Sequence, residues 1–271
     1  MSRLWPDELG VHLSPRRLCI VRTRRGLRRR VVREHVQPVE PGGGGGWEGA
    51  LAALEAQFAS PGWAGVGVRA VVSDHWVRYA VVPYAAELSN AEEREAHARE
   101  LLASAYGDAV NGWSLCVSDA PPGAARIACA MPGALLAALG EACARARAKL
   151  RSVQPQLIAA HNRWRDVIPA DDAWFVTIDE GSLAAARMRG AGFDRVHAVR
   201  IGADWVRELK RLQTFGRLAN SSGSDGRVYV DAPFAWRTLG ATMGSDLEWL
   251  EHGSPRLTTA LRLDELRRGV P

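Results

Sequence analysis

The sequence predicts an α/β protein with two lobes, in which mixed sheets are flanked by helices. Apolar runs of strand length alternate along the chain with stretches whose apolar residues recur at helical spacing. Two separate groups of strands joined by short turns occur, one near the N-terminus and one between Ala173 and Gly202. A length of 271 residues suits one large bilobed domain or two smaller ones.

Composition is that of a soluble globular protein, with 47% hydrophobic and 24% charged residues. No apolar run approaches the ~18 residues that a membrane span needs, and the N-terminus lacks the apolar core of a signal peptide, so we expect a cytoplasmic protein. The net charge of +5 suggests affinity for acidic partners. The four cysteines and seven histidines have no metal-ligand spacing.

The first half begins with two expected strands and a hairpin. The stretch from Leu9 to Val21 reads as a strand interrupted by a turn at Ser14-Pro15, and Leu27 to Val36 returns after a turn at Gly26. Asp74 and His75 stand side by side, but without a nucleophile motif they are interpreted as a turn. The other elements expected in this half are a helix at 47–59, strands at 66–72 and 76–83, a helix at 92–105 opened by a capping box at 89–92, paired strands at 113–117 and 126–130, and helices at 132–153 and 156–165.

The second half opens with three strands joined by tight turns. Apolar runs at Trp174–Ile178 and Leu183–Met188 flank Asp179-Glu180-Gly181-Ser182, and a third strand, Val196–Ile201, ends at Gly202. A helix at 204–218, a strand at 227–231, and short helices near 247–250 and 261–268 are expected to follow.

Seven arginines lie between Arg22 and Arg33 around the expected hairpin tip. They could form a patch for phosphate, nucleic acid or an acidic protein surface. The favoured interpretation is a solvated turn whose arginines point outward while Leu27, Val31 and Val32 face inward. The candidate residues for an acidic partner are Arg24, Arg25, Arg28, Arg29 and Arg30.

The second-half motifs resemble those of actin-like ATPases, in which Asp-x-Gly lies in the first hairpin and Arg-x-Ile-x-x-Gly ends the third strand; this chain has Asp179-x-Gly181 and Arg200-Ile201-Gly202. The order of elements over residues 8–235 resembles the actin-like platform proteins of type IV pili and type II secretion, the PilM family and the cytoplasmic domain of the GspL family. The resemblance implies an actin-like (RNase H-like) architecture with a first lobe at 1–155, a helix-hairpin insertion at about 89–131, and an abbreviated second lobe at 156–271.

The resemblance also indicates where a nucleotide would bind. The first phosphate loop should carry Asp-x-Gly, but we place His12 and Ser14 there, which removes the carboxylate that would hold hydrated magnesium. In an ATP-binding relative, a segment after the third strand would enclose adenine and ribose, but only one helix is available for it here. The strand that should end in a glycine pair runs into Pro233. Only Asp179, Gly181 and Ser182 remain, so we expect a degenerate and empty nucleotide loop, no ATP or magnesium, and no catalysis. An RNase H-type nuclease would likewise need an aspartate on the first strand.

By this resemblance we expect a non-catalytic cytoplasmic scaffold, held at the inner membrane through a partner. The implied partner is the cytoplasmic tail of an inner-membrane pilus or secretion subunit, with the motor ATPase and a second copy of the chain as further candidates. Two alternatives stay open. One is a nucleic-acid-associated protein that uses the Arg22–Arg33 patch, which is the less favoured partner class, and the other is a nucleotide-dependent actin-like switch.

Overall fold

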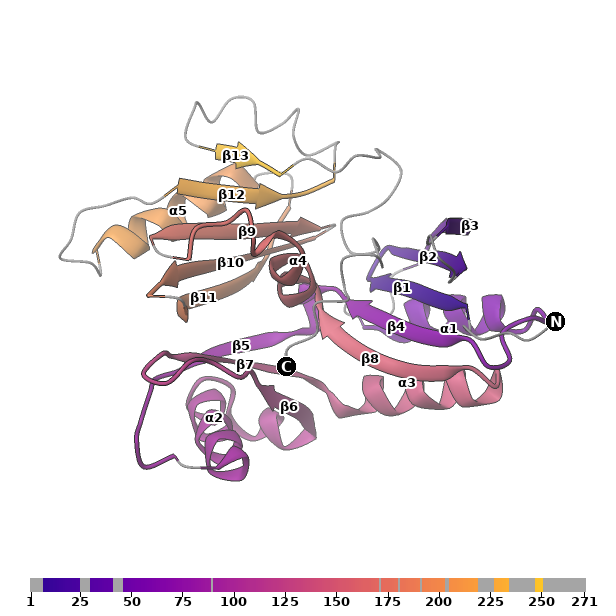
Figure 1. The fold of residues 1–271 in the computed structure, drawn as a ribbon, viewed down its shortest axis with the longest axis horizontal. Helices are drawn as coiled ribbons and strands as arrows, with labels where there is room; N and C mark the ends of the chain where they lie inside the picture. The colour runs from indigo at the N-terminus through magenta and orange to yellow at the C-terminus, as the bar shows by residue number, and fades with distance from the viewer. Residues whose placement is uncertain are drawn as a thin grey trace.

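The structure, a computed structural model, describes residues 7–24, 30–40, 46–88, 90–170, 172–179, 181–190, 192–202, 205–218, 227–233 and 247–250. The described residues form two lobes, each built on a five-stranded sheet, and a smaller three-stranded sheet beside them (Figure 1). The mixed sheets flanked by helices agree with the α/β prediction.

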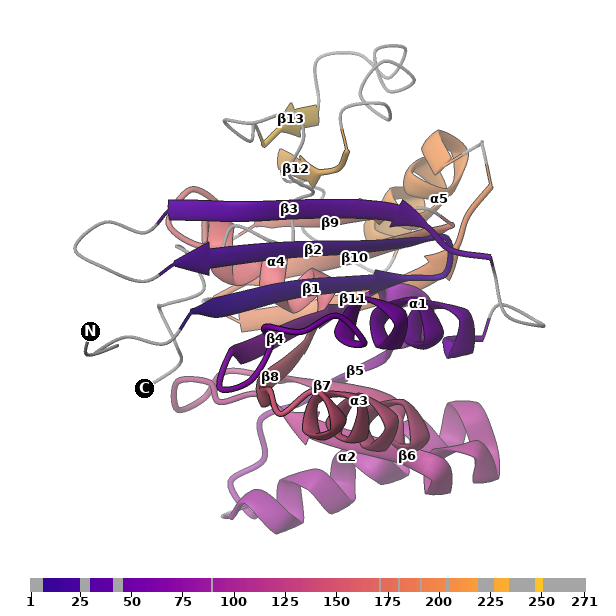
Figure 2. The same cartoon turned by 90° about the vertical axis from the view of Figure 1, so that its right-hand side faces the viewer.

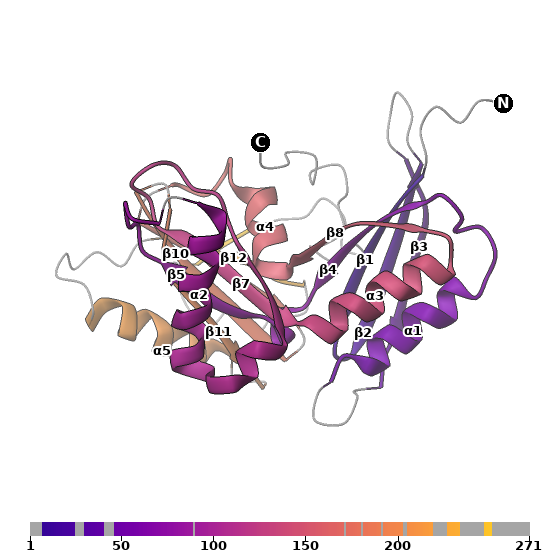
Figure 3. The same cartoon turned by 90° about the horizontal axis from the view of Figure 1, so that it is seen from below.

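The first-lobe sheet combines an antiparallel meander with two parallel strands. β1, β2 and β3 run antiparallel to one another, and β4 and β8 continue the sheet parallel to β1. Helices α1 and α3 cover one face, where Leu54 and Leu139 are buried against Leu9 and Leu13 (Figures 2 and 3). The bounds are β1 Glu8–Ser14, β2 Arg17–Arg24, β3 Arg30–Pro38, α1 Glu48–Phe58, β4 Gly67–Val72, α3 Gly133–Arg145 and β8 Lys149–Pro155.

The second-lobe sheet repeats this topology. Its first three strands form an antiparallel meander, and the last two run parallel to β9, so the spatial order is again third, second, first, fourth, fifth. Helix α5 covers one face with Trp205 and Leu209, both fully buried. The bounds are β9 Ala173–Asp179, β10 Ser182–Arg189, β11 Gly192–Arg200, α5 Trp205–Leu218, β12 Arg227–Asp231 and β13 Leu247–Trp249.

The third sheet has the order β5-β7-β6 and is covered by α2 (Figure 3). Asn90 caps α2, and its side chain and that of Glu93 form a capping box. Cys116 on β6 lies opposite Cys129 on β7, and both are free thiols. The bounds are β5 Arg78–Val82, α2 Ala91–Tyr106, β6 Trp113–Val117 and β7 Arg126–Pro132, with short 3-10 helices η2 at Asp74–Trp76 and η3 at Gly107–Gly112.

Helix α4, Gln156–Trp164, lies between the two lobes (Figure 1). Ala159 is buried against first-lobe residues of β2 and β4, whereas Leu157 and Ala160 are buried with second-lobe residues that include Phe175. Because Ala159 and Ala160 have small side chains, the helix can approach both sheets closely. α4 therefore joins the hydrophobic cores of the two lobes.

Three predicted elements differ in the structure. The expected helix at 132–153 ends at Arg145, and residues 149–155 form β8. Arg147 has a left-handed backbone, with φ 54°, which interrupts the helix, and pairing with β4 then satisfies the backbone of the edge strand despite the helix-favouring composition.

The expected short helix near 247–250 is instead β13, which pairs with β12 and places Trp249 against Trp205 with ring centroids 5.9 Å apart. The α2 capping box begins one residue later than predicted, at Asn90. The predicted helix at 261–268 lies outside the described residues. Among the helices that the structure describes, none is long and apolar enough to cross a membrane.

Candidate functional site

Two equivalent hairpin turns face each other between the lobes. In the first lobe, Ser14 of β1 pairs with Arg17 of β2, and two residues lie between them. In the second lobe, Asp179 of β9 pairs with Ser182 of β10, again with two residues between them. The repeated topology thus makes Ser14 the counterpart of Asp179, and Arg17 the counterpart of Ser182.

This equivalence corrects the placing of the first phosphate loop by two residues. The place that corresponds to Asp179 is held by Ser14 rather than His12, and the place of Gly181 is held by Arg16. Gly181 has φ 85°, which the glycine adopts without steric cost, whereas no positive φ occurs at Arg16. The first hairpin therefore has neither the carboxylate nor the glycine of the Asp-x-Gly pattern.

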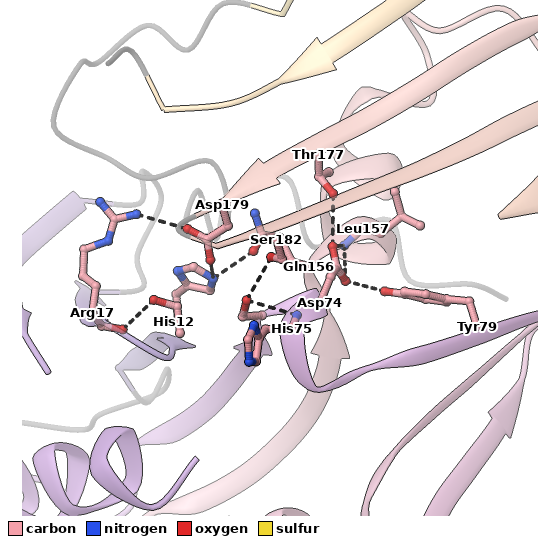
Figure 4. A network of polar contacts seen from close by, with 12 residues as sticks. His12, Arg17, Asp74, His75, Tyr79, Gln156, Leu157, Thr177, Asp179 and Ser182 are labelled. Carbon is pink, nitrogen blue, oxygen red and sulfur yellow. Dashed lines mark hydrogen bonds and ion pairs between the residues drawn. The ribbon is translucent and has the colours of Figure 1, made fainter. Parts of the chain in front are cut away.

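Two side chains of the first lobe lie next to the carboxylate of Asp179 (Figure 4). Its Oδ1 lies 3.4 Å from Nη2 of Arg17, and its Oδ2 lies 3.6 Å from Nε2 of His12. The side chains of Asp179 and His12 are each 2% exposed, and that of Arg17 is 18% exposed. A partly buried ion pair therefore connects the tips of the two hairpins.

His12 also contacts the helix between the lobes. Its Nε2 lies 3.2 Å from Oε1 of Gln156, the first residue of α4. Burial lowers the pKa of His12, and the positive charge of Arg17 acts in the same direction, while Asp179 and the bond to Gln156 raise it. The imidazole is therefore neutral at pH 7, and because Gln156 offers an acceptor oxygen, Nε2 carries the hydrogen.

Asp74 forms a second connection between the lobes. It lies in η2, and its buried carboxylate accepts hydrogen bonds from the Tyr79 hydroxyl, from the Leu157 amide at 3.1 Å, and from Thr177 Oγ1 of β9 at 3.0 Å (Figure 4). Burial raises the pKa of Asp74 to about 6, although these hydrogen bonds act in the opposite direction. The predicted turn at Asp74 and His75 is present, but the long-range partners of Asp74 were not predicted.

Ser182, the third residue of the candidate nucleotide loop, also faces the first lobe. Its Oγ lies 3.5 Å from Oγ of Ser73, and both serines are buried. Next to Ser73, His75 is only partly buried, and burial together with the charges of Arg200 and Arg78 lowers its pKa. The structure thus brings Asp179, Gly181 and Ser182 together at the junction between the lobes, where the side chains of Asp179 and Ser182 contact first-lobe residues.

The end of β12, where a nucleotide site was expected to have a glycine pair, also makes contacts within the chain. Asp231, the last residue of β12, is buried, and its Oδ2 accepts a hydrogen bond from the Trp164 indole at 3.1 Å. Ala232 after it is buried as well. Within the described ranges, no group of three or more His, Cys, Asp or Glu residues is arranged to hold a metal ion.

The arginine-rich hairpin differs from its prediction. Arg24 ends β2 and is exposed, and Arg30 begins β3, while Arg25, Arg28 and Arg29 lie outside the described residues, as does Leu27. Val31 and Val32 were expected to face inward, but each is 45% exposed. The reason is that β3 is the edge strand of the sheet, and a bulge near Val32 shifts its register against β2.

No protein-family model matches the chain, and a comparison with curated proteins found no match. Solved structures, in contrast, are similar to it. The chain is similar to PilM in the PilM-PilN type IV pilus biogenesis complex, with a TM-score of 0.64 and 17% identity over 90% of this chain and 88% of that chain. It is also similar to the cytoplasmic domain of EpsL, an inner-membrane component of the type II secretion system of Vibrio cholerae, with a TM-score of 0.57 and 14% identity over 96% of this chain and 94% of that chain.

A third similar structure is a protein of unknown function with an actin-like ATPase fold from Bacteroides thetaiotaomicron, with a TM-score of 0.57 and 9% identity over 90% of each chain. At these identities the likeness shows the fold. The chain has the actin-like fold that was expected from its motifs, and its structural neighbours include platform proteins of pilus and secretion systems.

Proposed function

We propose that this protein is a non-catalytic cytoplasmic scaffold of a type IV pilus or type II secretion assembly, which binds the cytoplasmic tail of an inner-membrane subunit. The observation that carries the proposal is the contact between Arg17 and Asp179. In this chain, the carboxylate of the remaining nucleotide-loop motif is paired with the chain's own Arg17, and the neutral imidazole of His12 lies next to it. The protein's likeness in fold to PilM and to the EpsL cytoplasmic domain supplies the class of machine.

A nucleotide with magnesium would have to displace this network. Hydrated magnesium needs carboxylate oxygens, and the first hairpin offers Ser14 at the place of the carboxylate. The free energy of binding would also have to compensate for breaking the ion pair of Asp179 with Arg17 and for moving the imidazole of His12 away from Asp179. ATP hydrolysis is therefore not part of the proposed function.

The same contacts favour a fixed arrangement of the two lobes. Ser73, Asp74 and His12 of the first lobe each contact the β9–β10 region of the second. An actin-like switch needs lobes that change their arrangement with the bound nucleotide. A scaffold that presents one surface to a partner has no such need, which is why we favour the scaffold over the nucleotide-dependent switch.

The proposed partner follows from the solved complex. PilM was solved with PilN as a type IV pilus biogenesis complex, and EpsL is an inner-membrane component of the type II secretion system. By this likeness, the chain associates with the inner membrane from the cytoplasm through a membrane subunit. The motor ATPase of the machine and a second copy of the chain are further proposed partners.

The experiment is affinity capture from a detergent extract of the native host with the tagged full chain, washed at high salt and analysed by mass spectrometry. We expect an inner-membrane pilus or secretion subunit to be retained. A synthetic peptide of that subunit's cytoplasmic tail should then bind the purified chain and compete with the captured subunit.

Two results would contradict the proposal. One is recovery of nucleic acid or ribosomal proteins alone, lost in the salt wash. The other is capture of the membrane subunit only in the presence of magnesium-ATP, with capture lost in Asp179→Ala, since this would indicate a nucleotide-dependent switch.

A further inference from the structure

One end of the first-lobe sheet gathers basic side chains from distant parts of the sequence. Across the sheet, Thr23 pairs with Glu8, Glu8 with Gly67, and Gly67 with Lys149. The C-terminal end of β2 and the N-terminal ends of β1, β4 and β8 therefore lie at the same edge (Figure 2). We call this edge the basic end; its exposed cations are Arg24, Arg147, Lys149 and Arg151.

Unlike their neighbours, these four cations have no acidic partner among the residues that the structure describes. At the same end, Arg22 is paired with Asp7 at 2.9 Å and Arg69 with Glu8 at 2.8 Å. Arg145 is paired with Glu55 and Glu141. Within the described part of the chain, no ion pair involves a cation of the basic end. Asp7, Glu8, Glu55 and Glu141 are paired with other arginines, so the positive charge of the basic end is not compensated by them.

Exposed apolar side chains lie beside Arg24, on the edge strand β3, whereas Lys149 and Arg151 lie on the opposite edge strand β8. Val31 pairs with Thr23 in the row that crosses the sheet, and Val32 follows at the bulge. Both valines are 45% exposed, and Arg24 and Arg33 flank them in the two strands and are exposed as well. The basic end therefore combines cations with a small apolar surface.

We propose that the basic end binds the anionic phospholipid headgroups of a membrane surface. Anionic lipids attract clustered lysine and arginine side chains, and adjacent apolar residues gain from burial at the boundary between headgroups and acyl chains. This contact would present the edge of the first-lobe sheet, with the ends of β2 and β8, to the membrane.

The surface suits lipid better than nucleic acid. Single-stranded nucleic acids are bound by basic grooves with aromatic side chains on which bases stack. The large exposed apolar residues of the basic end are valines, whereas the exposed aromatic residues that the structure describes, Tyr84 and Tyr106, lie after β5 and at the end of α2. The inference stands on the charges of this chain and does not depend on a bound membrane subunit.

The test is flotation of the full chain with lipid vesicles, without any partner protein. Vesicles of phosphatidylcholine with phosphatidylglycerol should carry the protein, vesicles of phosphatidylcholine alone should not, and binding should weaken as salt rises. The triple variant Arg24→Gln, Lys149→Gln, Arg151→Gln should lower the partition coefficient roughly a hundred-fold, about five-fold for each charge removed.

The matched control is Arg189→Gln, Lys210→Gln, Arg227→Gln, which removes the same number of arginines and lysines from exposed positions of the second lobe. It should change the partition coefficient by less than about five-fold, because these residues lie away from the proposed surface. The melting temperatures of both variants show that the fold is kept. Val31→Ser with Val32→Ser should remove the part of the binding that resists salt.

Three outcomes would overturn the inference. In the first, the two triple variants lose vesicle binding equally, so that only net charge matters. In the second, neutral vesicles bind as well as anionic ones. In the third, the chain binds duplex DNA or RNA at salt concentrations where no vesicles are bound. A failure here leaves the tail-capture result unaffected, so the two proposals are tested separately.

Discussion

The two hairpins at the junction between the lobes have the same register and different side-chain chemistry. Each is closed by a residue pair with two residues between, and each follows the first strand of its sheet. The second hairpin places the buried acid Asp179 at its closing position, where the first has Ser14. The first hairpin places the base Arg17 where the second has Ser182, and Arg17 binds Asp179.

On the proposed function, this difference explains how the chain keeps an actin-like fold without binding a nucleotide. Two carboxylates at equivalent hairpins, facing each other, would repel unless a metal ion lay between them. With a serine and an arginine in the first hairpin, the remaining carboxylate is neutralised by the protein itself. On the proposed function, the junction then needs no ligand for its stability.

The largest expected effect concerns Asp74, which connects the two lobes outside the hairpins. It tests whether the stability of the junction depends on the hairpin contacts alone. Asp74 binds Thr177 two residues before Asp179, and its pKa is raised by burial to about 6. The folded state therefore takes up a proton more readily than the unfolded state, and stability falls as pH rises from about 4 to about 6. The expected decrease in unfolding free energy over this pH range is about 3 kcal/mol.

The measurement is urea unfolding of the wild type and of Asp74→Asn across this pH range, because the variant removes the titration. The unfolding free energy of the variant has to be subtracted from that of the wild type, because His161 titrates in the same range. Burial lowers the pKa of His161 to about 4, which makes stability rise with pH. A wild-type advantage over the variant that does not decrease between pH 4 and 6 would contradict the account.

An intermediate effect tests the contact between the hairpins directly. Arg17→Ser should cost about 2 kcal/mol of unfolding free energy, because Asp179 would stay buried with one partner fewer. The double variant Arg17→Ser, Asp179→Ser gives both hairpins uncharged side chains at their closing positions. A double-mutant cycle should show a coupling of about 1 kcal/mol or more. Purely additive costs would mean that the pair contributes nothing to the junction.

The smallest effect compares the two turns themselves. Gly181→Ala should cost about 1 kcal/mol, because φ 85° disfavours a residue with a Cβ although no atom lies within 4 Å of the place that the Cβ would take. Arg16→Gly, the equivalent position in the first hairpin, should lower stability by less, through unfolded-state entropy alone. Chemical denaturation of both variants checks this, and equal costs would refute the difference between the turns.

Local patterns in the sequence predicted most elements of the fold. The elements that were predicted wrongly are those whose conformation is determined by contacts between residues distant in the sequence. Strands β6 and β12 agree with prediction to the residue, since their apolar runs end at clear turns. Residues 149–153 were predicted as helix because Leu150 and Val153 continue the apolar stripe of the preceding helix, but pairing with β4 decides their conformation.

The candidate site shows the same limit. Asp179 and Gly181 were identified by motif, whereas the roles of Arg17 and Asp74 depend on partners more than 80 residues away in the chain, Asp179 for the first and Leu157 and Thr177 for the second. The first phosphate loop was placed two residues too early because hairpin register cannot be read from the apolar pattern of a single strand.

The most direct test of the central claim is thermal unfolding of the wild type and of Asp179→Ala with rising magnesium-ATP. If the junction is closed by Arg17 and His12, the melting temperature of the wild type stays within about 1 °C at saturating nucleotide, since a ligand stabilises only a state that binds it. A rise of several degrees that follows nucleotide concentration in the wild type and disappears in Asp179→Ala would show a working nucleotide site and contradict the account.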